Sequence, residues 1–177
     1  MYIWVGINVD RQILSLKEKV RATENKLGFQ NSNFTLPFHI SLKISFLIDD
    51  CDFDHIIEDI RNIYKSTAPF EIEVKGIEWE NNIAWIRMKE NSDLTSLSQR
   101  INQMLLEKYR IPLHEYDLDF KFHTTLFMDD DREKVRIAFD EVKACPLPDK
   151  LIVNRLLIGG SPAGKLGTFN IIEETII

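Results

Sequence analysis

Cysteine is scarce in this chain of 177 residues, which has only Cys51 and Cys145, far apart in the sequence. Two distant cysteines make neither a C-x-x-C motif nor the framework of a disulfide-rich protein. Gly/Ser-rich and proline-rich tracts that would link two domains are missing as well. Because 44% of the residues are hydrophobic, we expect a single domain over residues 1–177, with one substantial core, in a reducing cytoplasm.

Positive charge is in deficit, with 22 Lys and Arg against 28 Asp and Glu and a net charge of −6. Tight binding along duplex DNA depends on Lys and Arg that release phosphate counterions, so we expect none here. A small nucleotide or an RNA end is still an acceptable partner. Long hydrophobic runs are also missing: the apolar residues 1–10 are too short to cross a membrane and lack the positive flank and cleavage site of a signal peptide. We expect a first strand there and no contact with a membrane.

Hydrophobic spacing predicts the same order of elements twice, with an offset near 80 residues. The order is strand, helix, strand, helix, strand. In the first copy the elements fall at residues 2–9, 10–27, 38–46, 50–64 and 70–78. In the second copy the strands fall at residues 83–88, 120–128 and 151–158, with helices that begin near Ser92 and after Asp131. We therefore expect two lobes, residues 1–79 and 80–160, with equivalent strands meeting at the centre. A glycine-rich turn at 159–165 would lead into a C-terminal hairpin strand within 161–177.

Histidine is rare, with four in the chain, and two of the four begin the same pattern of histidine, any residue, hydroxyl residue. Side chains two apart on a strand share a face, so each pattern predicts an imidazole beside a hydroxyl. If the two strands are neighbours, one imidazole is placed to take a proton while the other gives one. The two motifs are His39-Ile40-Ser41 and His123-Thr124-Thr125.

Each motif strand also carries a lysine in the same alternation. Lys43 is two residues after Ser41, and Lys121 is two residues before His123. We therefore expect both lysines on the histidine faces, where they would assist in binding a phosphate. Arg87, in the first strand of the second repeat, is a further candidate for a substrate contact.

Paired H-x-[ST] motifs about eighty residues apart in a duplicated chain of this length resemble the 2H phosphoesterase superfamily, which includes 2′-5′ RNA ligases and cyclic phosphodiesterases. The resemblance covers nearly the whole chain. It implies that His39 and His123 act as acid and base and that Ser41 and Thr125 hold the phosphate. Ser41 stands where the family often has threonine, and serine keeps the hydrogen-bond donor.

The repeat and the resemblance together predict an α+β, duplicated bilobal fold. In it, two pseudo-twofold-related antiparallel sheets carry helices on their outer faces and enclose a central cleft. The implied activity is metal-independent hydrolysis of 2′,3′-cyclic phosphates or 2′-5′ linkages of nucleotides or RNA ends. We expect a monomer without a cofactor, whose partner is a nucleotide or RNA terminus with a cyclic or 2′-phosphate. Which histidine is the acid stays open.

Several alternatives remain. The same residues would serve RNA-end joining or trimming, and a non-catalytic nucleotide or RNA-end binding protein would keep the groove without turnover. A scaffold protein would hold the two histidines far apart. Acidic runs at 49–50 and 129–131 suggest a metal site, but both come just before helices, and we interpret them as helix caps. Scattered histidines and cysteines also argue against a zinc protein. Trp4 is interpreted as packing.

Overall fold

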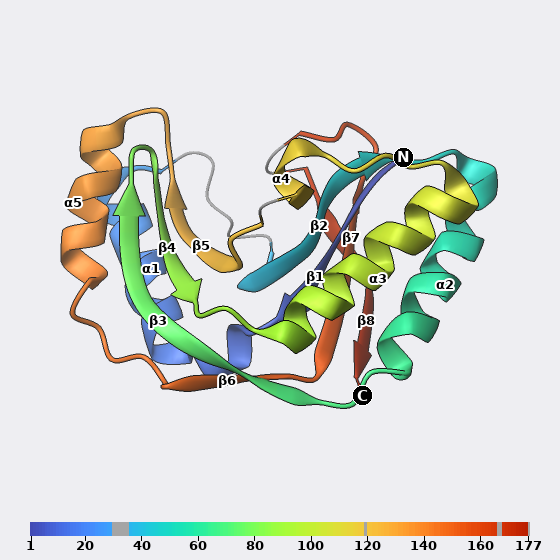
Figure 1. Cartoon of the computed structure of the whole chain (residues 1–177). Helices are drawn as coiled ribbons and strands as arrows, with labels where there is room; N and C mark the ends of the chain where they lie inside the picture. The colour runs from blue at the N-terminus through green and yellow to red at the C-terminus, as the bar shows by residue number, and fades with distance from the viewer. Residues whose placement is uncertain (30–35, 119, 166–167, 177) are drawn as a thin grey trace.

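The structure is a computed structural model that describes residues 1–29, 36–118, 120–165 and 168–176. Alternating and helical hydrophobic patterns become strands and helices close to the expected bounds (Figure 1). The elements, with two short 3₁₀ turns η1 and η3, are β1 (Tyr2–Asn8), η1 (Asp10–Gln12), α1 (Leu14–Leu27), β2 (His39–Leu47), η3 (Asp50–Asp52), α2 (Phe53–Lys65), β3 (Phe70–Glu80), β4 (Ile83–Met88), α3 (Ser92–Tyr109), α4 (Glu115–Leu118), β5 (His123–Met128), α5 (Arg132–Val142), β6 (Lys150–Val153), β7 (Arg155–Ser161) and β8 (Asn170–Ile176).

The strands form two four-stranded sheets in the orders β2-β1-β7-β8 and β5-β4-β3-β6, and every pair of neighbours is antiparallel. Helices α2 and α3 pack on the first sheet, and α1 and α5 pack on the second. The edge strands β2 and β5 contact each other at the centre of the molecule (Figure 1). The predicted α+β fold with two antiparallel sheets is therefore confirmed.

The two halves of the chain exchange elements. Strand β3 ends the first copy of the repeat but pairs with β4 of the second copy, while β7 ends the second copy but pairs with β1. In the same way, α1 packs beside α5 and α3 packs beside α2. Each layer therefore contains segments from both halves, and the two layers do not coincide with residues 1–79 and 80–160.

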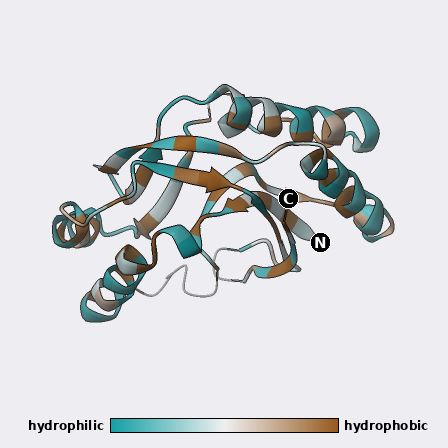
Figure 2. Cartoon of the chain, turned by 90° about the horizontal axis from the view of Figure 1, so that it is seen from below, coloured by the Kyte–Doolittle hydropathy of each residue, from teal (hydrophilic) through white to brown (hydrophobic). Residues whose placement is uncertain are grey.

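Side-chain alternation in β1 separates a core face from the opposite face. Ile3, Val5 and Ile7 belong to the main hydrophobic core between sheet and helices, whereas Trp4 belongs to a smaller cluster with Leu157. Figure 2 shows hydrophobic segments gathered on the central strands, while the helices carry both hydrophilic and hydrophobic stretches. The face that carries Trp4 is thus turned away from the helices, and we call it the inner face of the first sheet.

The helix ends agree with the capping prediction for the second acidic run and differ from it for the first. Gly28 ends α1 in the left-handed conformation, with φ 68°. The Asp131 carboxylate caps α5 by accepting the backbone N–H groups of Glu133 and Lys134, as predicted for the second acidic run. The first run differs, because the Asp49 side chain makes no capping hydrogen bond to η3.

The run at 151–158, expected to be one strand, is two strands. It breaks at Asn154, where the chain leaves the second sheet as β6 and enters the first as β7. Gly159 and Gly160 also lie inside β7 rather than in the turn, which comes after Ser161. Strand β8 completes the expected hairpin, of which residues 166–167 and 177 lie outside the described residues.

A β-bulge in β2 overturns the expectation for Lys43. Gly6 pairs with Ser41, but the adjacent Val5 pairs with Lys43, so Leu42 is an extra residue in β2. The extra residue breaks the two-residue alternation, and Lys43 points away from the face that carries Ser41. Its side chain is 2% exposed. Its ammonium forms an ion pair with Asp117, which is 1% exposed, and donates to the carbonyl oxygen of Pro112 at 3.3 Å.

Breaking this ion pair is expected to destabilise the fold. In a Lys43→Met variant the Asp117 carboxylate stays buried without its partner, and we expect a loss of about 3–5 kcal/mol in the free energy of unfolding. Urea denaturation measures this loss. Adding Asp117→Asn removes the uncompensated charge and recovers most of the loss. Equal stability of Lys43→Met and wild type would contradict a buried pair.

Candidate active site

His39 and His123 begin the two edge strands that meet at the centre, and both side chains are partly buried. Burial is the main cause that lowers the pKa of each imidazole below the ordinary 6.5. The proximity of His123 lowers the pKa of His39 further. The fold therefore brings the two predicted histidines close enough for the charge of His123 to affect His39.

Backbone carbonyl groups orient both rings in the same way. Nδ1 of His39 lies 2.9 Å from the carbonyl oxygen of Pro37, and Nδ1 of His123 lies 2.7 Å from that of Lys121. A carbonyl oxygen only accepts hydrogen bonds, so we assign the proton of each neutral ring to Nδ1. Nε2 is then the nitrogen of each imidazole that is left to take or give a proton.

Each imidazole also lies against a tryptophan from the neighbouring strand. The ring centroids of Trp4 and His39 are 4.3 Å apart with 25° between their planes, and those of Trp85 and His123 are 4.8 Å apart with 43°. Sequence reasoning assigned Trp4 to packing and missed Trp85. The available signal was that the two tryptophans are separated by nearly the same offset as the two histidines.

The two tryptophans reach their histidines from different positions. Trp85 pairs directly with Thr125 in the β4–β5 register, whereas Gly6 occupies the corresponding place beside Ser41. Trp4 lies over Gly6 instead. The approach is so close that a Cβ atom at position 6 would come within 2.7 Å of the Trp4 ring. Glycine at position 6 therefore makes room for the indole that supports His39.

The two histidines have cross-strand neighbours of different charge. Arg87 is the cross-strand neighbour of His123, and Asn8 holds that position beside His39. The Arg87 guanidinium lies 5.5 Å from the Trp85 ring, its Nε is 3.6 Å from Glu78, and it lowers the pKa of His123 after the effect of burial. Within the part of the chain that the structure describes, its buried Nε and Nη1 have no hydrogen-bond partner. Such unpaired donors are suited to an anion.

The remaining predicted residues differ in position. Ser41 and Thr125 are partly buried and share the faces of their histidines, two residues further along each strand. Lys121 is exposed just before β5, and Lys43 lies in its buried ion pair. Among the residues that the structure covers, no three His, Cys, Asp or Glu side chains gather to hold a metal ion. Over the same residues, no helix is both long and apolar enough to span a bilayer.

Comparison with known proteins identifies the family. The sequence model of the 2′-5′ RNA ligase superfamily matches residues 10–158, well over half of the chain. This chain belongs to the 2′-5′ RNA ligase superfamily. The resemblance to 2H phosphoesterases is thereby confirmed, and membership of a superfamily of phosphoesterases supports an enzyme. No curated protein matches the sequence.

Solved structures share the fold of this superfamily member at low sequence identity. TT0787 of Thermus thermophilus is 16% identical, with a TM-score of 0.64 over 99% of this chain and 97% of that one. LigT of E. coli in its apo form is 14% identical, with a TM-score of 0.59 over 99% and 96%. Usb1 of Kluyveromyces marxianus is 12% identical, with a TM-score of 0.50 over 99% and 98%.

The packing of Trp4 against Gly159 can be tested directly. A Cβ atom at Gly159 would lie 2.1 Å from Trp4 Nε1, so Gly159→Ala must displace the indole that contacts His39. We expect a loss of about 1–3 kcal/mol in unfolding free energy together with a changed tryptophan fluorescence spectrum. Gly160→Ala is the matched control, because its nearest contacts would be flexible side chains, the Ile172 methyl groups at 3.2 and 3.3 Å and the Met1 sulfur at 3.6 Å. If the two variants unfold alike, the close packing of Trp4 on Gly159 is wrong.

Proposed function

We propose that this protein is a metal-independent phosphodiesterase that hydrolyses 2′,3′-cyclic phosphates or 2′-5′ linkages of nucleotides or RNA ends. One observation carries the proposal: His39 and His123 come from equivalent edge strands, and each has Nδ1 bound to a carbonyl group and Nε2 left for proton transfer. Two such imidazoles supply the acid and the base that phosphodiester cleavage needs.

For a 2′,3′-cyclic phosphate, one imidazole removes a proton from water, which attacks phosphorus in line with the leaving oxygen. The other imidazole protonates the ribose oxygen as its bond to phosphorus breaks, and the products are a phosphomonoester and a free hydroxyl group. Ser41 and Thr125 donate hydrogen bonds to the non-bridging oxygens. Arg87 supplies positive charge beside His123, and Lys121 adds charge at the exposed end of β5.

The ligands of related structures support this class of substrate. Structures of E. coli LigT contain 3′-AMP, phosphate and ATP, and these share 10–12% sequence identity with the present chain. A nucleotide or an RNA end with a terminal phosphate fits a site with two imidazoles, two hydroxyl groups and the Arg87 guanidinium, whose Nε and Nη1 have no hydrogen-bond partner among the described residues. The same groups would also join a cyclic phosphate to a hydroxyl group by the reverse path.

Replacing either histidine tests the chemistry. We expect His39→Ala and His123→Ala each to lower kcat on 2′,3′-cyclic nucleotides by about 10²–10⁴-fold, because proton transfer to or from the substrate is lost. Hydrolysis is followed in excess chelator, with His55→Ala as the control, since His55 is exposed on α2. A double His39→Ala, His123→Ala variant that still hydrolyses cyclic phosphates would refute the mechanism. Tight binding by the wild type with no turnover at any pH would instead favour a binding protein.

The pH profile gives a second test. Both imidazoles have a pKa below the ordinary 6.5, so the singly protonated pair that the mechanism needs is most abundant at a pH below 6.5. We expect kcat/KM to follow a bell-shaped profile with its maximum there. Arg87→Gln removes a cation that lowers the pKa of His123, so the limb of the profile that His123 sets moves to higher pH. A maximum above pH 6.5 in the wild type, or an unmoved limb in the variant, would contradict this assignment.

A further inference from the structure

A small hollow lies at the end of β1, where Asn8 pairs with His39 of the neighbouring strand. Its volume is about 170 Å³, and its lining residues come from β1, η1 and the crossing between β6 and β7. They are Asn8, Arg11, Gln12, Ile152, Asn154 and Arg155.

The hollow is continuous with the catalytic strand through Asn8. Asn8 is the cross-strand neighbour of His39, so their side chains share a face. On the other side of β1, Ile7 pairs with Leu156, which places Asn8 beside Arg155 one step further along. Glu174 Oε1 joins the two, accepting a hydrogen bond from Asn8 Nδ2 at 3.0 Å and one from Arg155 Nη1 at 3.3 Å. His39, Asn8 and Arg155 thus form one row across three adjacent strands.

The charge of the hollow is opposite to that of the protein. It contains two arginines in a chain whose net charge is −6. Glu174 neutralises part of Arg155, but Arg11 is exposed and forms no ion pair within the described ranges. The Gln12 amide is already occupied, since it bonds the backbone N–H and carbonyl of Ile152 at 2.7 and 2.9 Å. Arg11 and the free donors of Arg155 are therefore the groups available to an anion.

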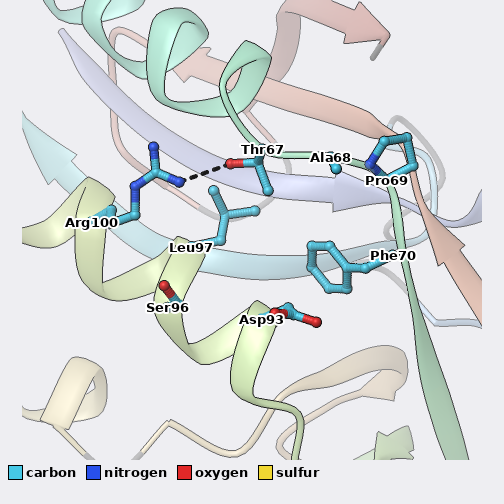
Figure 3. Close-up of a pocket in the computed structure, with 8 residues that line it drawn as sticks. All are labelled: Thr67, Ala68, Pro69, Phe70, Asp93, Ser96, Leu97 and Arg100. Carbon is cyan, nitrogen blue, oxygen red and sulfur yellow. Dashed lines mark hydrogen bonds between the residues drawn. The ribbon is translucent and has the colours of Figure 1, made fainter.

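A larger hollow elsewhere offers a contrast. It measures about 290 Å³ and lies between the start of β3 and helix α3 (Figure 3). Its arginine, Arg100, donates to Thr67 Oγ1 at 3.0 Å and to Ser66 Oγ at 2.6 Å, and Asp93 adds a negative charge to the wall. Its one guanidinium is committed to the end of α2, so this hollow is less suited to a phosphate than the one beside Asn8.

We propose that the hollow lined by Arg11 and Arg155 binds the phosphodiester next to the reacting phosphate, so that the preferred substrate is an RNA end of at least two nucleotides. The inference rests on the proposed function, which places the reacting phosphate between the two histidines. His39 and Arg155 are two strand spacings apart, roughly 10 Å, so the second phosphate binds on the same face as the first. Arg11 contacts it from the exposed rim, and Arg155 contacts it from the floor.

Binding of two ligands that need no turnover tests the inference. Calorimetry compares adenosine 3′-monophosphate with the dinucleotide that carries the same terminal phosphate and one additional phosphodiester. We expect the dinucleotide to bind the wild type about tenfold more tightly, the effect of one charge-assisted contact. Arg11→Gln should reduce the difference to within about twofold, and the salt dependence of dinucleotide binding should weaken by about 0.7 in its log–log slope. Arg132→Gln, an exposed arginine on α5, is the matched control and should keep the preference.

Glu174→Gln tests the same hollow in the opposite direction. The amide oxygen still accepts from Asn8, but a negative charge is removed, so we expect dinucleotide binding to tighten severalfold while mononucleotide binding stays the same. Equal affinity of the wild type for both ligands, or the same loss in Arg11→Gln and Arg132→Gln, would overturn the inference. A dinucleotide preference without hydrolysis of either cyclic phosphates or 2′-5′ linkages would refute the proposed function alone, and hydrolysis without that preference would refute the hollow alone.

Discussion

The arrangement of this site depends on two carbonyl oxygens that belong to the residues two positions before each histidine. Because His39 and His123 are the first residues of their strands, the carbonyl groups of Pro37 and Lys121 accept from Nδ1 of the imidazoles. The intervening carbonyl groups accept hydrogen bonds from the adjacent chain segment instead. That of Phe38 accepts from the backbone N–H of Val9, and that of Phe122 accepts from the backbone N–H of Met88. The same short backbone arrangement thus orients a ring at the start of both edge strands, and the meeting of those strands makes the two rings a pair.

The two histidines have neighbours of the same chemical type, but these neighbours stand at different positions. Each imidazole is covered by an indole, yet Trp4 reaches over Gly6 while Trp85 stands directly beside Thr125. Charge breaks the symmetry further, since a guanidinium stands beside one histidine and a neutral amide beside the other. Two groups of the same type are thereby placed in different electrostatic surroundings, which is the condition for dividing acid and base roles between them.

Much of this fold follows from periodicity, because an amphipathic helix or strand has to bury its apolar side whatever its neighbours are. The histidine faces were predictable for that reason. Lys43 was not, because a single extra residue at Leu42 inverts the alternation and the sequence around it carries no turn or glycine signal. The break at Asn154 and the contact of Trp85 with His123 depend on which strands become neighbours. Pairing between distant segments is information that local spacing does not contain.

The exchange of strands between the halves has a consequence for how the chain is made on the ribosome. Strand β1 emerges first and finds β2 early, but its other neighbour, β7, follows after most of the chain has been synthesised. Until then one long edge of β1 has unpaired backbone groups, and β3 has no partner in the first half. The amino-terminal half is therefore not an independent folding unit. Such distant pairings slow folding, and the nascent chain exposes apolar surface until its last strands arrive.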